Sequence, residues 1–301
     1  MGQQSSRRIT ALCSLLGYSR QAFYQHHKQR IKLALQHDLI IQRVLSIRTR
    51  QPQVGTRKLH IMLNDFMALH NMHLGRDALQ ELLREEGLLI RRRRRKVPRT
   101  TFSDHWMHKY ANLTIGLEPL KAHELWVSDI TYVAVGQGFA YLSLVTDVYS
   151  RMIVGYHLDA GLSAQACVKA LRMAMRHLPE KFSLIHHSDR GCQYCSAEYV
   201  QQLQSRSIAI SMTQHSDPRE NAIAERVNGI LKGELLKKQY STLAQGRSGI
   251  KEAIQIYNWE RLHGSVDMLT PGQAVQKTTV LNRWWKNYYK RKPKEANMQT
   301  G

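Results

Sequence analysis

The fold is decided by residues 185–234, which read IHHSDRGCQYCSAEYVQQLQSRSIAISMTQHSDPRENAIAERVNGILKGE. An apolar run that leads into Asp189 is typical of a buried strand, and a helical periodicity near the end of the stretch carries Glu225. Thirty-five residues separate these two acids. A third acid, Asp129, lies sixty positions before Asp189 in another strand-like run, residues 125–133. Two strands and one helix therefore each carry one carboxylate.

Carboxylates of this kind suit a pair of hard divalent cations, because Mg²⁺ prefers oxygen ligands and leaves its other positions to water and substrate phosphate. Two such ions roughly 3.5–4 Å apart can hold the attacking and leaving oxygens of a phosphodiester. We therefore expect Asp129, Asp189 and Glu225 to bind two Mg²⁺ ions. This is a geometric hypothesis, since it requires folding to bring the three acids to one point.

The charge of the chain points to a polyanionic partner. The 301 residues carry a net charge of +21, with a pI of about 10.1. Residues 1–123 hold 22 Lys or Arg and 8 Asp or Glu, residues 124–275 hold 15 and 14, and residues 276–301 hold 7 and 1. Basic arms that flank a nearly neutral block are expected to neutralise nucleic-acid phosphates. A charge that only kept the protein dispersed is rarely so unevenly placed.

The number of cysteines and the hydropathy of the chain indicate the cellular compartment in which the protein acts. Four cysteines are too few for a disulfide scaffold and suit a reducing cytosol. No apolar run approaches membrane-spanning length, so no membrane association is expected.

Residues 8–28 predict a helix-turn-helix. A short apolar-periodic helix ends at Gly17, and Ser19 can cap the helix that follows. The second helix would then offer several polar side chains to base edges and phosphates. These are Arg20, Gln21, Gln25, His27 and Lys28. A plain helical hairpin fits the pattern equally well, and the basic surroundings favour DNA.

A second unit of the same kind follows. Residues 31–50 are typical of a connecting helix, and two further amphipathic helices are expected at 56–66 and 76–86. An unbroken cationic run then repels itself unless it lies along phosphates. It consists of Arg91, Arg92, Arg93, Arg94, Arg95 and Lys96. A nuclear-localisation signal is an alternative that nothing else in the sequence supports.

The hydrophobic period changes after residue 124. Three strands are expected as an antiparallel meander, followed by alternating helices and strands. The strands are 125–135, 139–149, 152–160, 183–188 and 208–212, and the helices are 163–178, 196–205, 220–238 and 249–262. This order predicts the α/β class, with a ribonuclease H-like mixed five-stranded sheet and flanking helices, preceded by α-helical helix-turn-helix domains.

The last acid of the set lies on a helix whose geometry can be checked. Ala224, Val227 and Leu231 form an apolar stripe, while Glu225 and Lys232 share an adjacent face seven residues apart. One interpretation turns Glu225 toward metal and Lys232 toward a substrate phosphate. A solvated pair of opposite charges is an equally good interpretation of helix geometry alone.

Other acids and the cysteines have competing interpretations. Asp147 is either a neighbour of the site or a turn former at a strand end, and Glu220 at a helix start is favoured by the helix dipole. Glu234 lies on a different side of its helix from Glu225. Cys192 and Cys195 follow two histidines closely enough for zinc to be conceivable, but the spacing favours packing residues.

Five segments of the sequence match one family in order. They are WVSDITYV, LVTDVYSRMIVGYH, LIHHSDRGCQYCSAEYV, SMT with ENAIAERVNGILKGEL, and IYNWERLHGSVDMLTPGQAV. The chain resembles the OrfB-type DDE transposases of the IS-three family of bacterial insertion sequences, whose core is integrase-like. Upstream, ALCSLLGYSRQAFYQH, GTRKLHIML and ALQELLREEGLL look like that family's helix-turn-helix regions. The resemblance covers residues 8–276.

The resemblance implies roles for the acids and a reaction. Asp129, Asp189 and Glu225 correspond to the family's catalytic and metal-binding residues, with two Mg²⁺ ions and Mn²⁺ as a substitute. It also implies cleavage at the 3′ ends of the element and strand transfer by the freed 3′-OH. Lys232 is expected to position the phosphate, with His187 or Arg190 touching the DNA strand. The loop at 214–220 departs from the family's usual glycine-rich sequence.

Five segments follow along the chain: a first helix-turn-helix at 1–30, a connecting helix and second helix-turn-helix at 31–90, a basic linker at 91–123, the catalytic core at 124–275, and a basic aromatic tail at 276–301. The tail aromatics are expected to pack on the core or a partner protomer and its lysines to bind DNA.

The expected partners are double-stranded DNA, as transposon ends and target, and further copies of the chain in a synapse. The expected location is the bacterial cytoplasm at the nucleoid. A retrovirus-like integrase, a ribonuclease H-type nuclease and a catalytically inactive DNA-binding repressor stay as alternatives.

Overall fold

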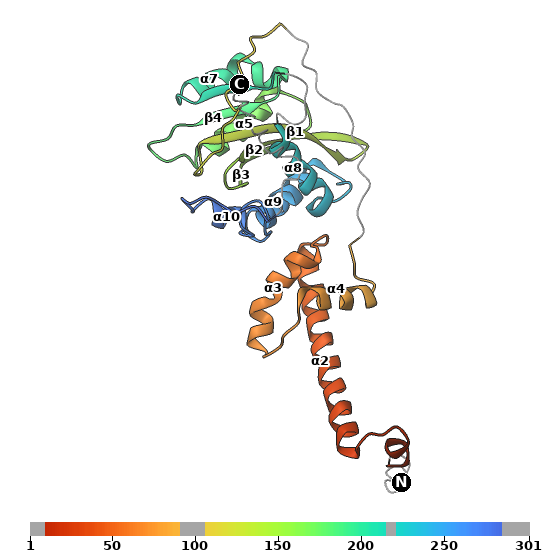
Figure 1. The fold of residues 1–301 in the computed structure, drawn as a ribbon. Coiled ribbons are helices and arrows are strands. Elements are labelled where there is room, and N and C mark those ends of the chain that lie inside the picture. The colour runs from red at the N-terminus through yellow and green to blue at the C-terminus, as the bar shows by residue number, and fades with distance from the viewer. Residues whose placement is uncertain (1–9, 91–105, 215–220, 285–301) are drawn as a thin grey trace, which may run out of the picture. The chain divides into compact units, whose positions relative to one another are not determined.

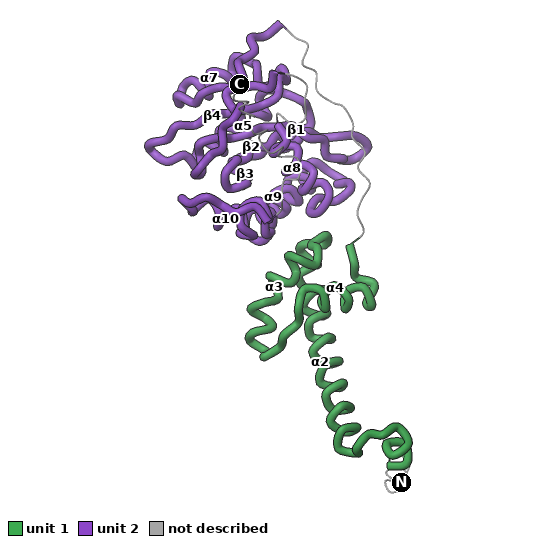
Figure 2. The backbone as a smooth tube through the Cα atoms, viewed as in Figure 1, with its two compact units in different colours: residues 1–93 green, residues 94–301 purple. Residues whose placement is uncertain are grey.

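The computed structural model describes residues 10–90, 106–214 and 221–284. The chain divides into two compact units, residues 1–93 and 94–301 (Figure 2). Several sequence predictions fall outside the described residues. They concern the cationic run from Arg91 to Lys96, Glu220, and the tail beyond Trp284. No helix among the described residues is both long enough and apolar enough to cross a bilayer.

Unit 1 is built from three well-defined helices, α2 (Arg20–Arg50), α3 (Thr56–Leu69) and α4 (Arg76–Glu85). Ser19 caps α2 as predicted, because its side chain accepts a hydrogen bond from Ala22 N at 3.0 Å. The core of this unit gathers buried aliphatic side chains from the end of α2 and from the other two helices. They include Ile40, Val44, Leu59, Leu63, Leu79 and Leu83.

Helix α2 differs from the predicted arrangement in its length. A boundary was expected between residues 30 and 31, but the helix runs through it without a break. The reason is local, since no Gly or Pro stands between Arg20 and Arg50 to stop helix propagation. The residues before Ile40 contribute little to the core, and apolar side chains such as Ile31 and Leu35 are exposed.

Unit 2 contains a five-stranded sheet in the order β3-β2-β1-β4-β5 (Figure 1). Its strands are β1 (Leu125–Val135), β2 (Gly138–Asp147), β3 (Ile153–Asp159), β4 (Ile185–Ser188) and β5 (Ala209–Met212). β1, β2 and β3 pair antiparallel, whereas β4 is parallel to β1 and β5 is parallel to β4. The predicted α/β class and ribonuclease H-like mixed sheet are confirmed.

Helices cover both faces of this sheet (Figure 1). They are α5 (Ala164–Met175), α6 (Cys192–Cys195), α7 (Ala197–Gln204), α8 (Ala222–Ile230), the π-helix η2 (Leu231–Leu235), α9 (Leu243–Trp259) and α10 (Pro271–Ala274). Trp126 of β1 packs on α5 and α7, while Val133 of the same strand packs on α8, η2 and α9. Residues of β1 therefore alternate between two separate cores.

Two helices differ from their predicted bounds. The expected helix at 220–238 is α-helical only to Ile230 and then widens into η2. The expected helix at 249–262 begins earlier, at Leu243, because Thr242 caps it by accepting a hydrogen bond from Gln245 N. The first of these differences matters for the site described below, because the π-helix contains Lys232.

Residues 106–123 were predicted as the end of a basic linker, but they pack against unit 2. Met107 and Tyr110 lie against the core under α5 and α7. Ala111 O accepts a hydrogen bond from Met212 N, and Leu113 N donates to the Ser211 hydroxyl at 2.9 Å. The segment therefore covers β5, the edge strand of the sheet, whose backbone groups need partners.

Candidate active site

Asp129 lies in the middle of β1 and is held by hydrogen bonds on both carboxylate oxygens. Its Oδ1 accepts from Ile130 N at 2.9 Å, and its Oδ2 accepts from the Asn228 side-chain amide at 2.6 Å. Asn221, at the start of α8, donates from its amide to Ser128 O at 3.0 Å. Two amides from the α8 region thus fasten that helix to the part of β1 that carries Asp129.

Asp189 directly follows β4, which is parallel to β1 and adjacent to it. Gly191 N donates to Asp189 Oδ1 at 3.0 Å, so the carboxylate is oriented by the turn that follows it. A Cβ atom placed on Gly191 would lie 3.0 Å from that same oxygen and 3.1 Å from Gln193 Oε1. A larger residue here would therefore push the Asp189 carboxylate and the Gln193 amide away by a few tenths of an ångström.

Glu225 occupies the first turn of α8, where the helix dipole favours a carboxylate. Its side chain is exposed, unlike the half-buried side chains of Asp129 and Asp189. The structure therefore delivers two of the acids from neighbouring parallel strands and the third from the helix that packs on one of them.

The electrostatics show that the three acids share one region. Burial, followed by the negative charges of Asp189 and Glu225, raises the pKa of Asp129 to about 7, against the hydrogen bonds from Ile130 and Asn228. Burial also raises the pKa of Asp189, against the hydrogen bond from Gly191 N. Among the described residues, no three His, Cys, Asp or Glu side chains already stand as a ligand set.

The residues present fit Mg²⁺ by their chemistry. The donors are carboxylate oxygens that repel one another where water is largely excluded, which is the situation a hard cation relieves. Asn228 supplies a further oxygen, because its Oδ1 is buried and has no hydrogen-bond partner in the described chain. The three carboxylates and this amide oxygen together form an oxygen donor set, as that ion requires.

Lys232 lies in the π-helix on the same side of unit 2 as the acids. Burial lowers the pKa of Lys232, and the negative charge of Asp129 acts in the opposite direction. The next acid in the π-helix, Glu234, forms a two-pronged ion pair with Arg261, at 2.7 Å to Nε and 2.8 Å to Nη2. This pair ties η2 to the end of α9 and so fixes the segment that carries Lys232.

The remaining residues named from the sequence fall in different places. Arg190 is half-buried next to Asp189. His187 differs from its expected role at the DNA strand, because its side chain is only 1% exposed and its Nδ1 bonds the Ser211 hydroxyl at 2.8 Å. The α2 side chains are exposed in unit 1. They are Arg20, Gln21, Gln25, His27 and Lys28.

Several open alternatives are decided by contacts. Asp147 is a turn former, since it accepts from Ser150 N, the Ser150 hydroxyl and His123 N. Cys195 is buried and its thiol contacts Met212 Sδ at 3.7 Å, as expected of a packing residue. Trp284, the first of the tail aromatics, donates from Nε1 to Asp267 Oδ1 and so packs on its own chain.

From the sequence, Asn228 was placed on the face of Glu225 without a role of its own, and Asn221 and Gly191 were missed. All three touch the strands that carry the aspartates, through hydrogen bonds or through a requirement for space. A signal was present in the spacing of one of them, because Asn228 lies three residues after Glu225 and so shares a face of α8 with it.

The comparisons with known proteins identify the class first. Two integrase core domain models match the chain, over residues 119–218 and 206–271. Among solved structures, the HTLV-2 integrase catalytic core domain in complex with magnesium aligns with 19% identity and a TM-score of 0.42. That alignment covers 52% of this chain and 99% of the other. The two sequence models, which together span residues 119–271, show that this part of the chain is an integrase core domain.

Curated relatives then give the family. A 31 kDa protein of insertion element IS600 from Shigella sonnei is 34% identical over 272 residues, which is 88% of this chain and 98% of the relative. The transposase InsF of insertion sequence IS3A from Escherichia coli K12 is 26% identical over 282 residues, 91% of this chain and 96% of the relative. The chain belongs to the insertion-sequence transposases of the IS3 family.

Proposed function

We propose that this transposase binds the ends of its insertion sequence, cleaves them at their 3′ ends and transfers the freed 3′-OH to a new phosphodiester. Asp129, Asp189 and Glu225 are the catalytic acids of this proposal. The observation that carries it is the environment of Asp129, whose carboxylate is withdrawn from water beside two other carboxylates. Such crowding is costly in a fold and is typical of functional sites.

The three acids would hold two Mg²⁺ ions, with Mn²⁺ able to replace them. Bound there, the ions supply Lewis acidity for the attacking and leaving oxygens of an in-line displacement. Asp129 would be one of the ligands, because its two oxygens are already oriented by Ile130 and Asn228. Asp189 would join it from the end of β4, the parallel neighbour of β1, and Glu225 from α8, which packs on β1.

The cationic side chains would position the substrate. Lys232 has its ammonium within electrostatic reach of Asp129, and the ion pair between Glu234 and Arg261 fixes its backbone segment. A lysine so held can orient the phosphate next to the acids as a point charge. Arg190 follows Asp189 directly and is the second candidate for contact with the strand.

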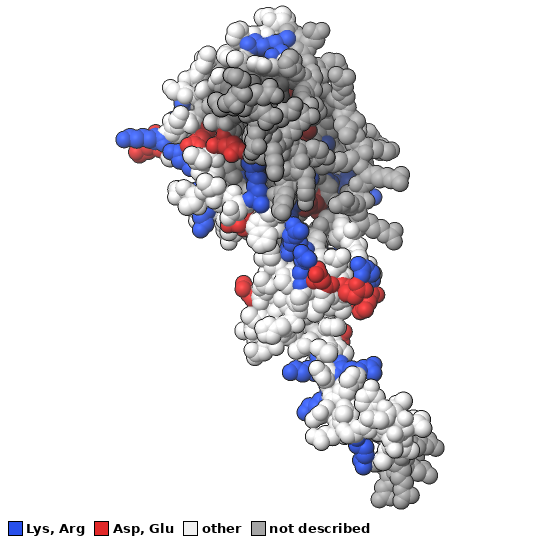
Figure 3. All heavy atoms as spheres, viewed as in Figure 1, with Lys and Arg blue, Asp and Glu red and all other residues white. Residues whose placement is uncertain are grey.

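Recognition of the ends would be the task of unit 1. Lys and Arg side chains lie at intervals along α2 on the face drawn in Figure 3, and the sequence of this helix contains one acid, Asp38. Contacts from Arg20, Gln21, Gln25 and Lys28 would fix the register on double-stranded DNA. Transposition joins two ends, so we propose that several copies of the chain act together on the nucleoid DNA.

A gel assay with labelled end DNA and Mg²⁺ tests this proposal. The wild-type chain is expected to give nicked and joined products, and Asp189→Asn neither. A nuclease would give nicks without joined products, and a repressor would bind without either. A second readout is independent of turnover: Mg²⁺ should raise the melting temperature of the wild type but not of Asp189→Asn, because a ligand of the folded state stabilises it.

A further inference from the structure

A pocket outside the acid site lies at the outer edge of β3, between α5 and α9. It has a volume of about 220 Å³, smaller than the roughly 300–1,000 Å³ of sites for drug-sized ligands. It therefore suits a compact group. Its lining residues are Tyr156, His157, Leu158, Met173, Arg247, Ile250 and Lys251.

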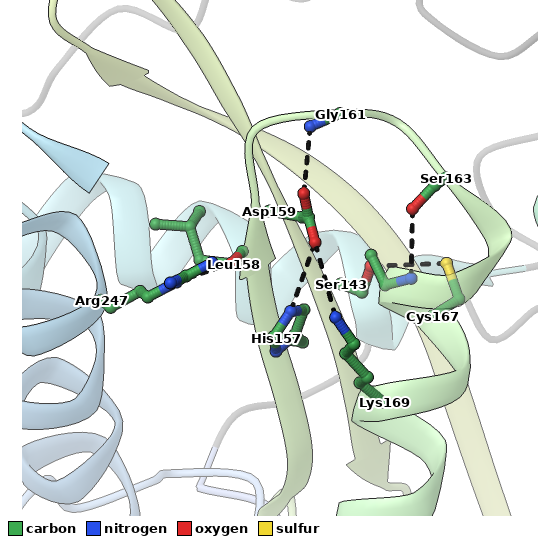
Figure 4. Close-up of polar contacts among 10 residues, drawn as sticks. Ser143, His157, Leu158, Asp159, Gly161, Ser163, Cys167, Lys169 and Arg247 are labelled. Atoms are coloured by element: carbon green, nitrogen blue, oxygen red, sulfur yellow. Dashed lines mark hydrogen bonds and ion pairs between the residues drawn. The ribbon is translucent and has the colours of Figure 1, made fainter. Parts of the chain in front are cut away.

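Arg247 is oriented by the exposed edge of the sheet. Its Nε donates to the carbonyl oxygen of Leu158, on the edge strand β3, at 3.2 Å (Figure 4). This bond leaves the two Nη groups of the guanidinium for another acceptor. Lys251 stands one helical turn further along α9 and is exposed. No ion pair recorded among the described residues involves Arg247 or Lys251.

The carboxylate of Asp159, two residues after His157 on β3, is already engaged. Asp159 Oδ1 accepts from Gly161 N at 3.3 Å, while Oδ2 lies 3.4 Å from His157 Nε2 and 4.0 Å from Lys169 Nζ (Figure 4). Burial lowers the pKa of His157, and the positive charges of Lys169 and Arg247 lower it further despite Asp159. Two positive charges, those of Lys169 and Arg247, therefore act near the pocket against the one negative charge of Asp159, and an anion can bind next to them.

We propose that this pocket binds a backbone phosphate of DNA, as a contact separate from the catalytic acids. A guanidinium presents a planar pair of donors that matches phosphate oxygens, and a nearby lysine adds a point charge. The floor of Leu158, Met173 and Ile250 gives no partner to a base edge, so the contact carries affinity rather than sequence information. This inference rests on the proposed DNA-processing function.

The sheet register sets where on the DNA the contact falls. Asp129 pairs with Leu144, and Leu144 pairs with Tyr156 of the pocket, so the three residues form one row across the sheet. Two strand spacings are roughly 10 Å. At 3.4 Å per base pair step, the bound phosphate would lie about three base pairs or more from the one being cleaved.

The test is the salt dependence of binding to an end duplex. Lys251→Glu reverses an exposed charge and places a carboxylate one turn from Arg247, without removing the bond to Leu158. The control is Lys181→Glu, an exposed lysine outside the pocket with the same change of charge. The slope of log Kd against log salt should fall by about 1 in Lys251→Glu, as expected for one lost phosphate contact, and stay unchanged in Lys181→Glu.

Other outcomes separate this inference from the function on which it rests. A wild type that binds no DNA overturns both. A wild type that binds, with the same slope in Lys251→Glu as in Lys181→Glu, overturns the pocket alone. A change of oligomeric mass in light scattering, with an unchanged slope, assigns the pocket to contact between copies. Calorimetric binding of inorganic phosphate that Lys251→Glu abolishes, again with an unchanged slope, assigns it to a free anion. Each of the last two also overturns the DNA contact.

Discussion

Asp129 and Asp147 are two aspartates of one antiparallel strand pair, and both are withdrawn from water. Burial raises the pKa of each carboxyl. Asp147 is 0% exposed and takes three hydrogen bonds from His123 and Ser150, which close a turn around it. Asp129 takes two, and its other neighbours include the negative charges of Asp189 and Glu225.

This difference in hydrogen-bond donors and neighbouring charges distinguishes an aspartate with a structural role from one that can take part in chemistry. The donors around Asp147 come from the chain itself, so its charge is compensated within the fold. Around Asp129 the charges of Asp189 and Glu225 are of like sign, and Lys232 supplies one positive charge, so two negative charges are left for a partner from outside the chain to compensate. A cation and a phosphate backbone are partners that this arrangement can accept. The two residues are therefore expected to respond to mutation in opposite ways.

The largest expected effect is the loss of chemistry without loss of fold. Asp189→Asn should lower the rate of end cleavage by on the order of 10³-fold or more, because the acids act as a unit. The free energy of unfolding should stay the same or rise by about 1 kcal/mol, since one of the like charges is removed. Cleavage assays and denaturant unfolding measure the two quantities. A large fall in the free energy of unfolding of Asp189→Asn would mean that Asp189, like Asp147, has a structural role.

The opposite result is expected at the structural aspartate. Asp147→Ala leaves the backbone N–H groups of His123 and Ser150 without their acceptor, and each unsatisfied buried group costs roughly 1–3 kcal/mol. We expect the free energy of unfolding to fall by about 3 kcal/mol. Cleavage per folded molecule, measured well below the melting temperature, should change little. A large fall in cleavage with unaltered stability would break the comparison.

The comparison also shows what the sequence could predict. Both aspartates stand in apolar patterns typical of strands, Asp129 in VSDITYV and Asp147 in LVTDVYS. Each pattern predicts a strand, but neither predicts which groups surround the aspartate. Strand β1 begins and ends as predicted, at Leu125 and Val135, because alternation and the glycine turn fix it locally. Which donors or charges surround an aspartate depends on residues far along the chain, such as His123 and Asn228.

Other misses have the same physical origin. The π-helix at Leu231–Leu235 has no local sequence signal, and the pairing of Glu234 with Arg261 is a tertiary contact. His187 was expected at the DNA strand because it stands near Asp189, but the register of β4 on β5 sets it beside Ser211. Proximity in sequence to Asp189 therefore did not predict the surroundings of the His187 side chain, which the pairing of the strands determines.

A smaller effect on the rate of cleavage is expected at Asn228, whose side-chain amide donates a hydrogen bond to Asp129. Asn228→Ala removes the 2.6 Å hydrogen bond to Asp129 Oδ2 and a buried oxygen near the proposed ions. We expect cleavage to fall about tenfold, equivalent to about 1.4 kcal/mol. The Mg²⁺ concentration needed for half-maximal cleavage should rise, which a purely structural role would not produce. Asn228→Gln, with the same amide one methylene further out, is the matched control and should recover part of the loss.

The smallest expected effect lies on the opposite face of β1, behind the acids. His186 is buried, and its Nε2 lies 2.7 Å from the Ser128 hydroxyl and 2.9 Å from the Tyr199 hydroxyl. Burial lowers the pKa of His186 from 6.5 to about 3, so the folded chain keeps it neutral while the unfolded chain takes up a proton. Its contribution to stability is therefore present above pH 6.5 and is lost as the pH falls from 6.5 toward 3.

Between pH 6.5 and about 5.5 the loss should come to about 1 kcal/mol of unfolding free energy from this residue. The measurement is the difference between wild type and His186→Gln, whose side chain is neutral throughout, in denaturant unfolding at both pH values. Taking the difference removes the contributions of Asp129 and Asp147, which titrate in both proteins. Equal pH dependence in the two would mean that His186 is protonated in the fold. The two hydroxyls would then accept hydrogen bonds from a charged ring directly behind Asp129, and the face of β1 opposite the acids would share in compensating them.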